Sequence, residues 1–386
     1  MKKPNDVLNR ARSLGSAIAD ASDEIERTRR IPATLFTQIH DARLCRMLLP
    51  QVFDGDQTEP EIYLRAIESI AQHDASVAWN LFVANSAALI AAHLEPETAR
   101  IIFGPSNALV AWGPPNGTVA IVEPGGYRVS GQWNFASGCR NATWMGLHCQ
   151  VAEPSGDLRL NGAGYPAIRT MLFPVKKAKL IDTWEAIGLR GTASDSYSVD
   201  ELFIPDAFTS TREEPELRRN RGSLYAFPMQ GLYAIGVAGV AMGIARAMLT
   251  AFKTLARNKA PRGLAKLAER ATIQSGVAQS EVKLGAARSY ALEVLTDIYE
   301  RAGPIGTIDF RDRAWVRLAA SNAICSAIEV ADWIYKQAGV EAIFPDSPFQ
   351  RRFRDIHTLS QQIQCRDAHF EEVGQILLGR PPKVFF

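Results

Sequence analysis

The feature that most constrains the fold is a change of pattern near residue 107 that reverses near residue 205. Between these points, short runs of β-branched and aromatic residues alternate with turn signals, whereas both flanks repeat apolar residues at helical spacing. The turn signals are clusters rich in proline and glycine at residues 114–117, 124–126, 154–157 and 161–162. We therefore predict a helical region, a small antiparallel sandwich or barrel, and a second helical region.

The first flank predicts a set of helices within about 110 residues. They are expected at residues 7–27, from Pro32 onward, and at residues 59–72, 75–93 and 97–103. Residues 75–93 are apolar nearly all round, which indicates a helix that is buried on several sides.

The second flank follows an arginine-rich connector at residues 210–222 and is dominated by long periodic segments. Helices are expected at residues 225–256, 264–302, 310–339 and 354–378. These are enough for an up-down bundle of four or five helices. We expect three domains: an N-terminal helical domain (1–110), a middle β-domain (111–222) and a C-terminal helical bundle (223–386).

Charge and cysteine content exclude several classes of protein. The chain has 43 basic and 41 acidic residues, a balance that gives no electrostatic reason to expect nucleic acid or an anionic membrane as partner. Five cysteines without a CxxC pair argue against a disulfide framework or structural zinc, and the histidines lack ligand spacing, so no metal site is expected. A reducing cytoplasm fits, because the charged N-terminus lacks the apolar run of a signal peptide. The apolar stretch 231–251 is interrupted by glycines and Arg246, which favours a buried helix over a membrane span.

Three motifs carry a resemblance to a known family. They are GYRVSGQWNFASG at residues 126–138, WEAIGLRGTASDS at 184–196 followed by Phe203, Ile204 and Pro205, and QAG at 337–339 with RRFRD at 351–355. Their order and separations resemble the acyl-CoA dehydrogenase superfamily over roughly residues 8–379. The resemblance implies a mainly α fold with a middle β-domain and a C-terminal four-helix bundle.

Within this superfamily the chain is most similar to the flavin-dependent two-component monooxygenases, such as dibenzothiophene monooxygenase and the oxygenase component of 4-hydroxyphenylacetate hydroxylase. The runs WNFASG (133–138), PNG (115–117) and DASVAW (74–79) favour that branch. The resemblance implies reduced flavin (FMN or FAD) supplied by a separate reductase, reaction with O2, and insertion of one oxygen atom into a small organic substrate. It also implies a homotetramer, and apolar residues on more than one face of the bundle helices support assembly.

The resemblance also implies which residues contact the flavin. In the first motif Phe135 can wall the ring, small residues permit close approach of the backbone, and the Ser137 hydroxyl can bond the flavin. A tight strand end with a capping serine is the alternative. In the second motif a hydroxyl-rich loop can bond the pyrimidine edge or the ribityl chain, whereas the alternative is a polar loop that closes a barrel, with Trp184 in its core. The predicted flavin contacts are Trp133, Phe135, Ala136, Ser137, Gly138, Trp184, Arg190, Gly191, Thr192 and Ser194.

A basic stretch at residues 253–262 is the expected phosphate contact. In related proteins this region meets the flavin phosphate across a subunit boundary, and the forked donors of Arg262 suit a phosphate. A solvated helix end is the alternative for each single residue.

The acid–base group is where the sequence departs from its relatives. The histidine of related hydroxylases, eight residues after the arginine of the RD pair, is replaced by Gln362, and the glutamate of acyl-CoA dehydrogenases is replaced by Ile363. Gln362 can bond a substrate but takes up no proton at neutral pH. His357 lies about 140° around a helix from Gln362, so only a bent helix or a shifted alignment would let it substitute. Ser137, Gln362 and His357 are the candidate catalytic residues.

The missing base leads to a hypothesis about the substrate. A nucleophilic amine nitrogen, sulfide sulfur or electron-rich heteroaromatic carbon would need no prior deprotonation. Two other functions stay open: an acyl-CoA-dehydrogenase-like FAD oxidoreductase, which needs the absent glutamate, and a non-catalytic scaffold that has lost the chemistry.

Overall fold

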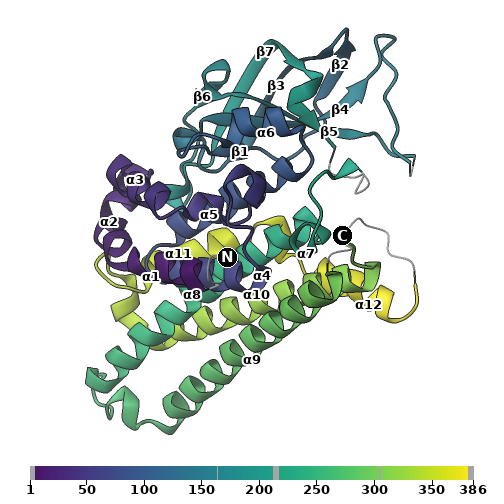
Figure 1. The fold of residues 1–386 in the computed structure, drawn as a ribbon. Coiled ribbons are helices and arrows are strands. Elements are labelled where there is room, and N and C mark those ends of the chain that lie inside the picture. Colours follow the sequence, from purple (N-terminus) through teal and green to yellow (C-terminus); the bar gives the residue numbers. More distant parts are fainter. Residues whose placement is uncertain (1–4, 163, 212–216, 304–305, 381–386) are drawn as a thin grey trace.

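In the computed structural model, a β-sheet stands on a layer of helices, and two long helices extend away below them (Figure 1). The structure describes residues 5–162, 164–211, 217–303 and 306–380. Within the arginine-rich connector, residues 212–216 therefore lie outside the described residues.

The N-terminal helices form near the predicted positions, except that the single helix predicted over residues 7–27 is divided at Leu14 into two. They are α1 (Asn5–Ser13), α2 (Gly15–Thr28), α3 (Ala33–Asp41), α4 (Pro60–Ala71), α5 (Ala75–Ala88) and α6 (Pro96–Phe103), with the short 3-10 helices η1 (Leu44–Arg46), η2 (Gln51–Phe53) and η3 (Leu89–Ala92). Asp74 caps α5, because its side chain accepts a hydrogen bond from the Val77 N–H. Every residue of α5 is buried, as its uniformly apolar sequence predicts.

The strands form one mixed sheet. They are β1 (Val110–Trp112), β2 (Val119–Glu123), β3 (Gly126–Ala136), β4 (Trp144–Ala152), β5 (Ile168–Pro174), β6 (Lys179–Ile181), β7 (Asp195–Pro205) and β8 (Thr209–Ser210). Their order is β6-β7-β3-β2-β4-β5-β8, with β1 beside β4. The expectation of a purely antiparallel arrangement is wrong, because both β1 and β2 pair with β4 in parallel.

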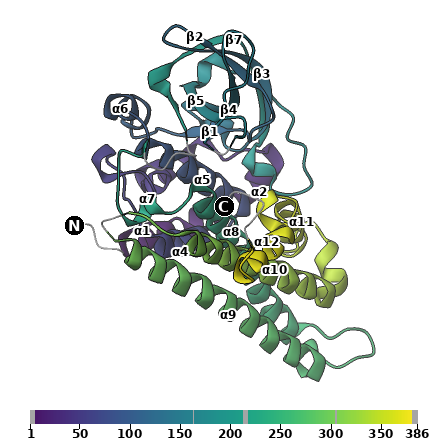
Figure 2. The same ribbon diagram turned by 90° about the vertical axis from the view of Figure 1, so that its right-hand side faces the viewer.

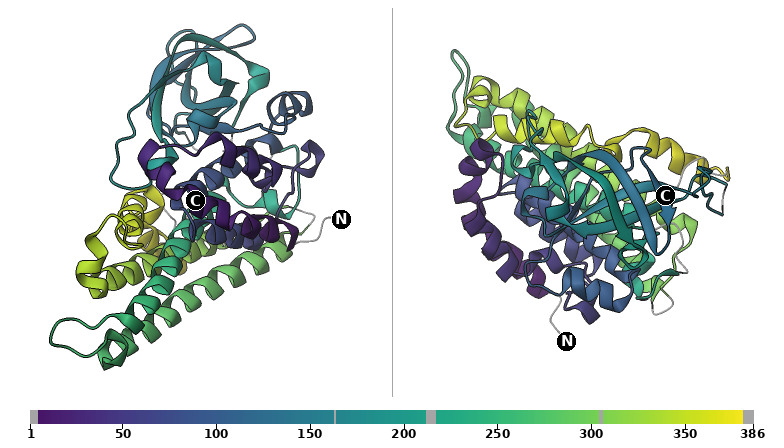
Figure 3. Two further views of the ribbon diagram at one scale, coloured as in Figure 1. Left: turned by 90° about the vertical axis from the view of Figure 1, so that its left-hand side faces the viewer. Right: turned by 90° about the horizontal axis from the view of Figure 1, so that it is seen from above.

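Four short 3-10 helices connect these strands. They are η4 (Cys139–Asn141), η5 (Val175–Lys177), η6 (Arg190–Thr192) and η7 (Asp206–Phe208). Seen from above, the sheet lies over the helical layer (Figure 3).

The C-terminal half contains α7 (Ser223–Ala226), α8 (Met229–Asn258), α9 (Ala271–Ala302), α10 (Phe310–Ala338), α11 (Gln350–Leu359) and α12 (Ala368–Leu377), together with η9 (Leu267–Glu269), η10 (Gly339–Ile343) and η11 (Ile363–Cys365). α8 and α9 run side by side, and the loop between them lies far from the sheet (Figure 2). α9 starts seven residues later than predicted, because Pro261 and Gly263 (φ 72°) begin an irregular loop.

The helix predicted over residues 354–378 is wrong. α11 ends at Leu359, and Gln362 has extended backbone angles (φ −77°, ψ 146°). The Gln362 side chain accepts a hydrogen bond from the backbone N–H of Gln364, which stabilises the break. The chain then forms η11 and a separate helix, α12.

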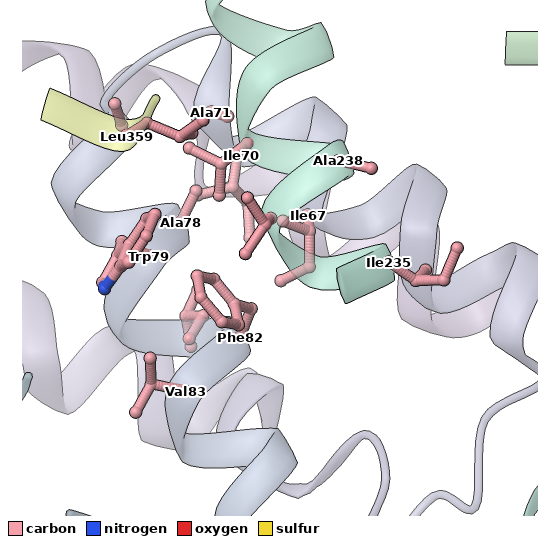
Figure 4. Packing of buried hydrophobic residues seen from close by; sticks show 14 of the residues in the cluster. Ile67, Ile70, Ala71, Ala78, Trp79, Phe82, Val83, Ile235, Ala238 and Leu359 are labelled. Carbon is pink, nitrogen blue, oxygen red and sulfur yellow. The ribbon is translucent and has the colours of Figure 1, made fainter. Parts of the chain in front are cut away.

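α8 is the central helix of the core and packs on α4 and α5 (Figure 4). Its glycines sit where these helices approach closely: a Cβ on Gly236 would meet Phe82, and one on Gly243 would meet Ala71. Two segments, Ala75–Ala92 and Met229–Asn258, are long and apolar enough to cross a membrane. The most apolar 18-residue stretch of each is 100% and 83% buried within the fold, as in core helices.

Candidate active site

A cavity of about 680 Å³ lies between the β-region on one side and α5, α8 and the segment from α11 to η11 on the other. Ligand pockets typically measure about 300–1,000 Å³, so the space admits a tricyclic ring and a small second molecule. Aromatic and amide side chains are frequent in its lining, and among the described residues that line it none is Asp or Glu. Its members include Trp79, Trp112, Phe135, Ser137, His148, Trp184, Ile187, Thr192, Ser194, Tyr233, His357, Gln361, Gln362, Gln364 and Arg366.

The sheet side of the cavity carries a chain of buried hydroxyl groups. Ser137 Oγ accepts a hydrogen bond from Trp79 Nε1 (3.1 Å) and lies 2.6 Å from Ser194 Oγ. Ser194 Oγ is in turn 2.7 Å from Thr192 Oγ1. Thr192 donates its own hydrogen to the Leu189 carbonyl (2.8 Å). Each hydroxyl is therefore held in place, and Ser137 presents an oriented group to the cavity.

Leu189 connects the hydroxyl chain to the helical side. Its carbonyl also accepts a hydrogen bond from Trp184 Nε1 (2.9 Å), which fixes that indole at the cavity wall. Its N–H donates to Asp355 Oδ1 on α11 (2.6 Å). Burial raises the pKa of Asp355 to about 7, and the hydrogen bond from Leu189 opposes that shift.

Phe135 has two uncommon features for a phenylalanine. Its φ is 62°, a left-handed value that bulky residues rarely adopt, and its side chain is 61% exposed. The ring stands edge-on to Trp184 at 6.3 Å between centroids. A strained aromatic residue that leaves its ring uncovered at a cavity is typical of a binding site.

Six predicted contacts do not line the cavity. Trp133 is fully buried and stacks on Tyr197 within the β-region, while Ala136 and Gly138 are buried beside it. Arg190 turns to α2, where its Nε donates to the Glu26 carbonyl. Gly191 packs against Ile25 and Ser76, and exposed Arg262 lies in the distant loop after α8. The structure brings together Phe135, Ser137, Trp184, Thr192, Ser194, His357 and Gln362.

The break after α11 places both His357 and Gln362 at the cavity. His357 Nε2 lies 2.7 Å from Asp332 Oδ1 on α10. Gln362 bonds the Tyr233 hydroxyl, which partly offsets the rise that burial causes in the pKa of Tyr233. The helical side thus offers amides and an imidazole, whereas the sheet side offers hydroxyls.

Sequence reasoning missed several lining residues, notably Trp79, Trp112, His148 and Tyr233. Trp79 could have been predicted from the sequence, because the DASVAW run that contains it belongs to the resemblance. His148 Nδ1 is 2.9 Å from Thr170 Oγ1, and its ring meets Trp112 edge-on. No local pattern marks His148, since it is one residue of an apolar strand.

The chain matches known proteins over nearly its whole length. The family model of the acyl-CoA dehydrogenase C-terminal domain matches residues 235–366. An indole-3-acetate monooxygenase of Acinetobacter baumannii is 27% identical over 87% of this chain and 85% of its own. The oxygenase component of an FADH(2)-dependent resorcinol hydroxylase of Rhizobium sp. is 25% identical over 98% of this chain and 95% of its own.

Solved structures confirm the predicted fold. XiaF from Streptomyces sp., determined in complex with FADH2 and glycerol, has a TM-score of 0.89 at 20% identity and covers 99% of this chain and 97% of its own. The 3-HSA hydroxylase from Rhodococcus sp. has a TM-score of 0.90 at 21% identity and covers 99% of each chain. The structures confirm the fold, and the family model together with the relatives confirms the predicted resemblance.

Proposed function

We propose that this chain, a member of the acyl-CoA dehydrogenase superfamily, is the oxygenase component of a two-component flavin-dependent monooxygenase. The cavity carries the proposal, because its volume, aromatic walls and oriented Ser137 hydroxyl fit an isoalloxazine ring with a small substrate beside it. Relatives named as flavin-dependent oxygenases match 98% and 91% of the chain, which supports the same chemistry.

Ser137, Thr192 and Ser194 would hold the polar edge of the flavin. Phe135 and Trp184 would cover its face. When bound, reduced flavin supplies the electrons that activate O2, so that one oxygen atom enters the substrate and the other leaves as water. The contribution of the protein is to keep the site dry and oriented, because water promotes unproductive oxidation.

The helical side would bind the substrate. Gln362 and Gln361 can donate and accept hydrogen bonds, and Arg366 adds the guanidinium at this wall. The hypothesis of oxygenation at nitrogen, sulfur or an electron-rich aromatic carbon stays a prediction.

We further propose a cytoplasmic homotetramer that receives reduced flavin from a separate reductase. All five cysteines are free, which fits a reducing compartment. Arg262 lies far from the cavity of its own chain, so any contact with the flavin phosphate would be made with a neighbouring subunit. The three predicted domains, with boundaries at 110/111 and 222/223, remain part of this proposal.

The proposal is tested by anaerobic mixing of the protein with chemically reduced FMN or FAD, an aromatic substrate panel and 18O2. We expect one 18O atom in a product, detected by mass spectrometry, and only hydrogen peroxide when the protein is omitted. Peroxide as the sole product for every substrate, with both flavins, would contradict the proposal.

An acyl-CoA dehydrogenase function makes a different prediction. It requires that acyl-CoA bleach the absorbance of bound oxidised FAD. We expect no bleaching, because no carboxylate stands among the described residues that line the cavity.

A further inference from the structure

We propose that the buried hydroxyl chain has one fixed hydrogen-bond direction, set by Thr192, and that Ser137 can therefore only accept a hydrogen bond from a molecule in the cavity. An acceptor in this wall favours a flavin that offers an additional N–H group, which is the reduced form. The inference rests on the proposed function and deepens it, because it assigns a redox-state preference of the cofactor site to particular residues.

The two ends of the chain carry groups that cannot exchange roles. An indole N–H only donates, and a carbonyl oxygen only accepts. At one end Trp79 Nε1 donates to Ser137 Oγ (3.1 Å), and at the other end the Leu189 carbonyl accepts from Thr192 Oγ1 (2.8 Å). The hydroxyl hydrogens between these ends must satisfy both conditions.

The hydrogens can be assigned one by one, because two hydroxyl oxygens at hydrogen-bond distance need a hydrogen between them. Thr192 uses its single hydrogen on Leu189, so the 2.7 Å contact between Ser194 and Thr192 uses the hydrogen of Ser194. The 2.6 Å contact between Ser137 and Ser194 then uses the hydrogen of Ser137. One lone pair of Ser137 accepts from Trp79, which leaves its second lone pair as the remaining capacity of this hydroxyl.

The Leu189 peptide is held at both of its polar groups, so its carbonyl stays in place as the end of the chain. Its N–H donates to Asp355 Oδ1 (2.6 Å), and its carbonyl also accepts from Trp184 Nε1 (2.9 Å). The indole hydrogen of Trp184 is thereby used within the wall. Hydrogen bonds that run in one direction polarise one another, so the second lone pair of Ser137 is a stronger acceptor than that of an isolated hydroxyl.

Exposure separates the three hydroxyl residues by role. All three line the cavity, but Ser137 and Ser194 are 7% and 5% exposed, whereas Thr192 is 0% exposed. Ser137 and Ser194 therefore have surface that can touch a bound molecule, while Thr192 acts mainly through Ser194. Thr192 is a positioning residue.

The direction of the chain matters because a flavin changes its hydrogen-bonding character on reduction. Reduction adds a hydrogen to a ring nitrogen, which turns an acceptor into a donor. An acceptor in the wall pairs with this N–H, whereas the oxidised ring sets two acceptors against each other, and a buried polar group without a partner is costly. The site therefore takes up reduced flavin and releases the oxidised form after turnover.

The test compares the affinities of the wild type and Thr192→Val for reduced and oxidised FMN and FAD, by anaerobic fluorescence titration. Valine keeps nearly the shape of threonine without its hydroxyl, so Ser194 can turn its hydrogen toward Ser137 and free the Ser137 hydrogen to donate. We expect the wild type to bind reduced flavin at least about tenfold more tightly than oxidised flavin. This ratio should fall about tenfold in Thr192→Val, since a hydrogen bond is worth about tenfold in affinity.

The midpoint potential of the bound flavin gives a second readout that a general loss of stability does not move. A site that prefers the reduced form raises this potential, so Thr192→Val should lower it by about 30 mV, the equivalent of tenfold for a two-electron couple. Thr192→Ser keeps the hydroxyl and should retain the potential and the affinity ratio of the wild type.

Ser194→Ala tests the same direction at a second position. It removes the acceptor of the Ser137 hydrogen, so the affinity ratio should fall here as well. The matched control is Thr183→Val, because Thr183 Oγ1 lies 2.8 Å from Ser196 Oγ but is not among the described residues that line the cavity. This control should leave the ratio and the potential unchanged.

The outcomes separate the two proposals. A wild type without preference for reduced flavin, or wild-type ratios in both Thr192→Val and Ser194→Ala, overturns the directed chain, and the monooxygenase function stands if 18O still enters a product. A wild type that binds neither redox form of either flavin overturns both.

Discussion

The two sides of the cavity differ in how their polar groups are held. On the sheet side, Ser137, Ser194 and Thr192 are buried and bonded to one another and to Trp79. On the helical side, Gln361, Ile363 and Arg366 are exposed, and the chain changes direction between two helices. A fixed, bonded wall suits a cofactor that is the same in every turnover, whereas an open wall of amides suits the substrate, which differs among relatives.

Gly188 joins the two sides, so its substitution should have the largest effect. A Cβ at this position would meet the Arg354 carbonyl and lie 2.7 Å from the backbone N of Asp355. Backbone atoms cannot move aside as a side chain can, so Gly188→Ala should push α11 from the loop and cost about 3 kcal/mol of unfolding free energy. Urea denaturation measures this cost.

The matched control is Gly374→Ala in α12, where an added Cβ meets nothing within 4 Å. This change should stabilise the protein by up to about 1 kcal/mol, since alanine favours helix. Equal stabilities of the two variants would show that the walls are not joined at Gly188.

Ser137→Ala should selectively weaken the binding of reduced flavin by the sheet side. It removes the acceptor of the Trp79 indole and the oriented hydroxyl, a loss of about 1.4 kcal/mol or tenfold in affinity for reduced flavin. Anaerobic flavin titration measures this change. Ser130→Ala is the control, because Ser130 lies on the same strand but bonds Glu201 at the surface. Unchanged flavin affinity in Ser137→Ala would remove this wall from the cofactor site.

The ionisation of Asp355, which bonds the two sides, should have a smaller effect, seen as a pH dependence of the free energy of unfolding. An unfolded aspartate has a pKa near 3.9, whereas burial raises the pKa of Asp355 to about 7 in the folded protein. The folded state therefore binds the extra proton between these values, and the free energy of unfolding should fall as pH rises from about 4 to 7. Asp355→Asn keeps an acceptor for the Leu189 N–H and should reduce this slope. A steeper slope in the variant would contradict the assignment.

The sequence predicted the sheet side better than the helical side, and local geometry explains why. The WNFASG run correctly located the strand end with Phe135 and Ser137. Strand alternation would place Trp133 and Phe135 on one face, but a register shift between Trp133 and Ala136 and the left-handed φ of Phe135 separate them. Trp133 therefore enters the β core while Phe135 reaches the cavity.

The helical side depends on the helix break after Leu359, which no residue in the sequence indicates. Residues 354–378 contain neither proline nor a glycine near Ser360, and the apolar period continues across the break. The break is set by tertiary contacts, including the Gln362 bond to Tyr233, which lies over 120 positions earlier. Helical periodicity could not show that His357 and Gln362 share a cavity.

The most direct test of the account is rapid mixing of the anaerobic protein and reduced flavin complex with oxygenated buffer, followed by absorbance in a stopped-flow instrument. A site that keeps water out should give a transient absorbance distinct from oxidised flavin, and this transient should outlast the oxidation of free reduced flavin and shorten in Ser137→Ala. Direct conversion to oxidised flavin at the rate of the free cofactor, with no transient in either protein, would contradict the claim that the cavity shelters the flavin.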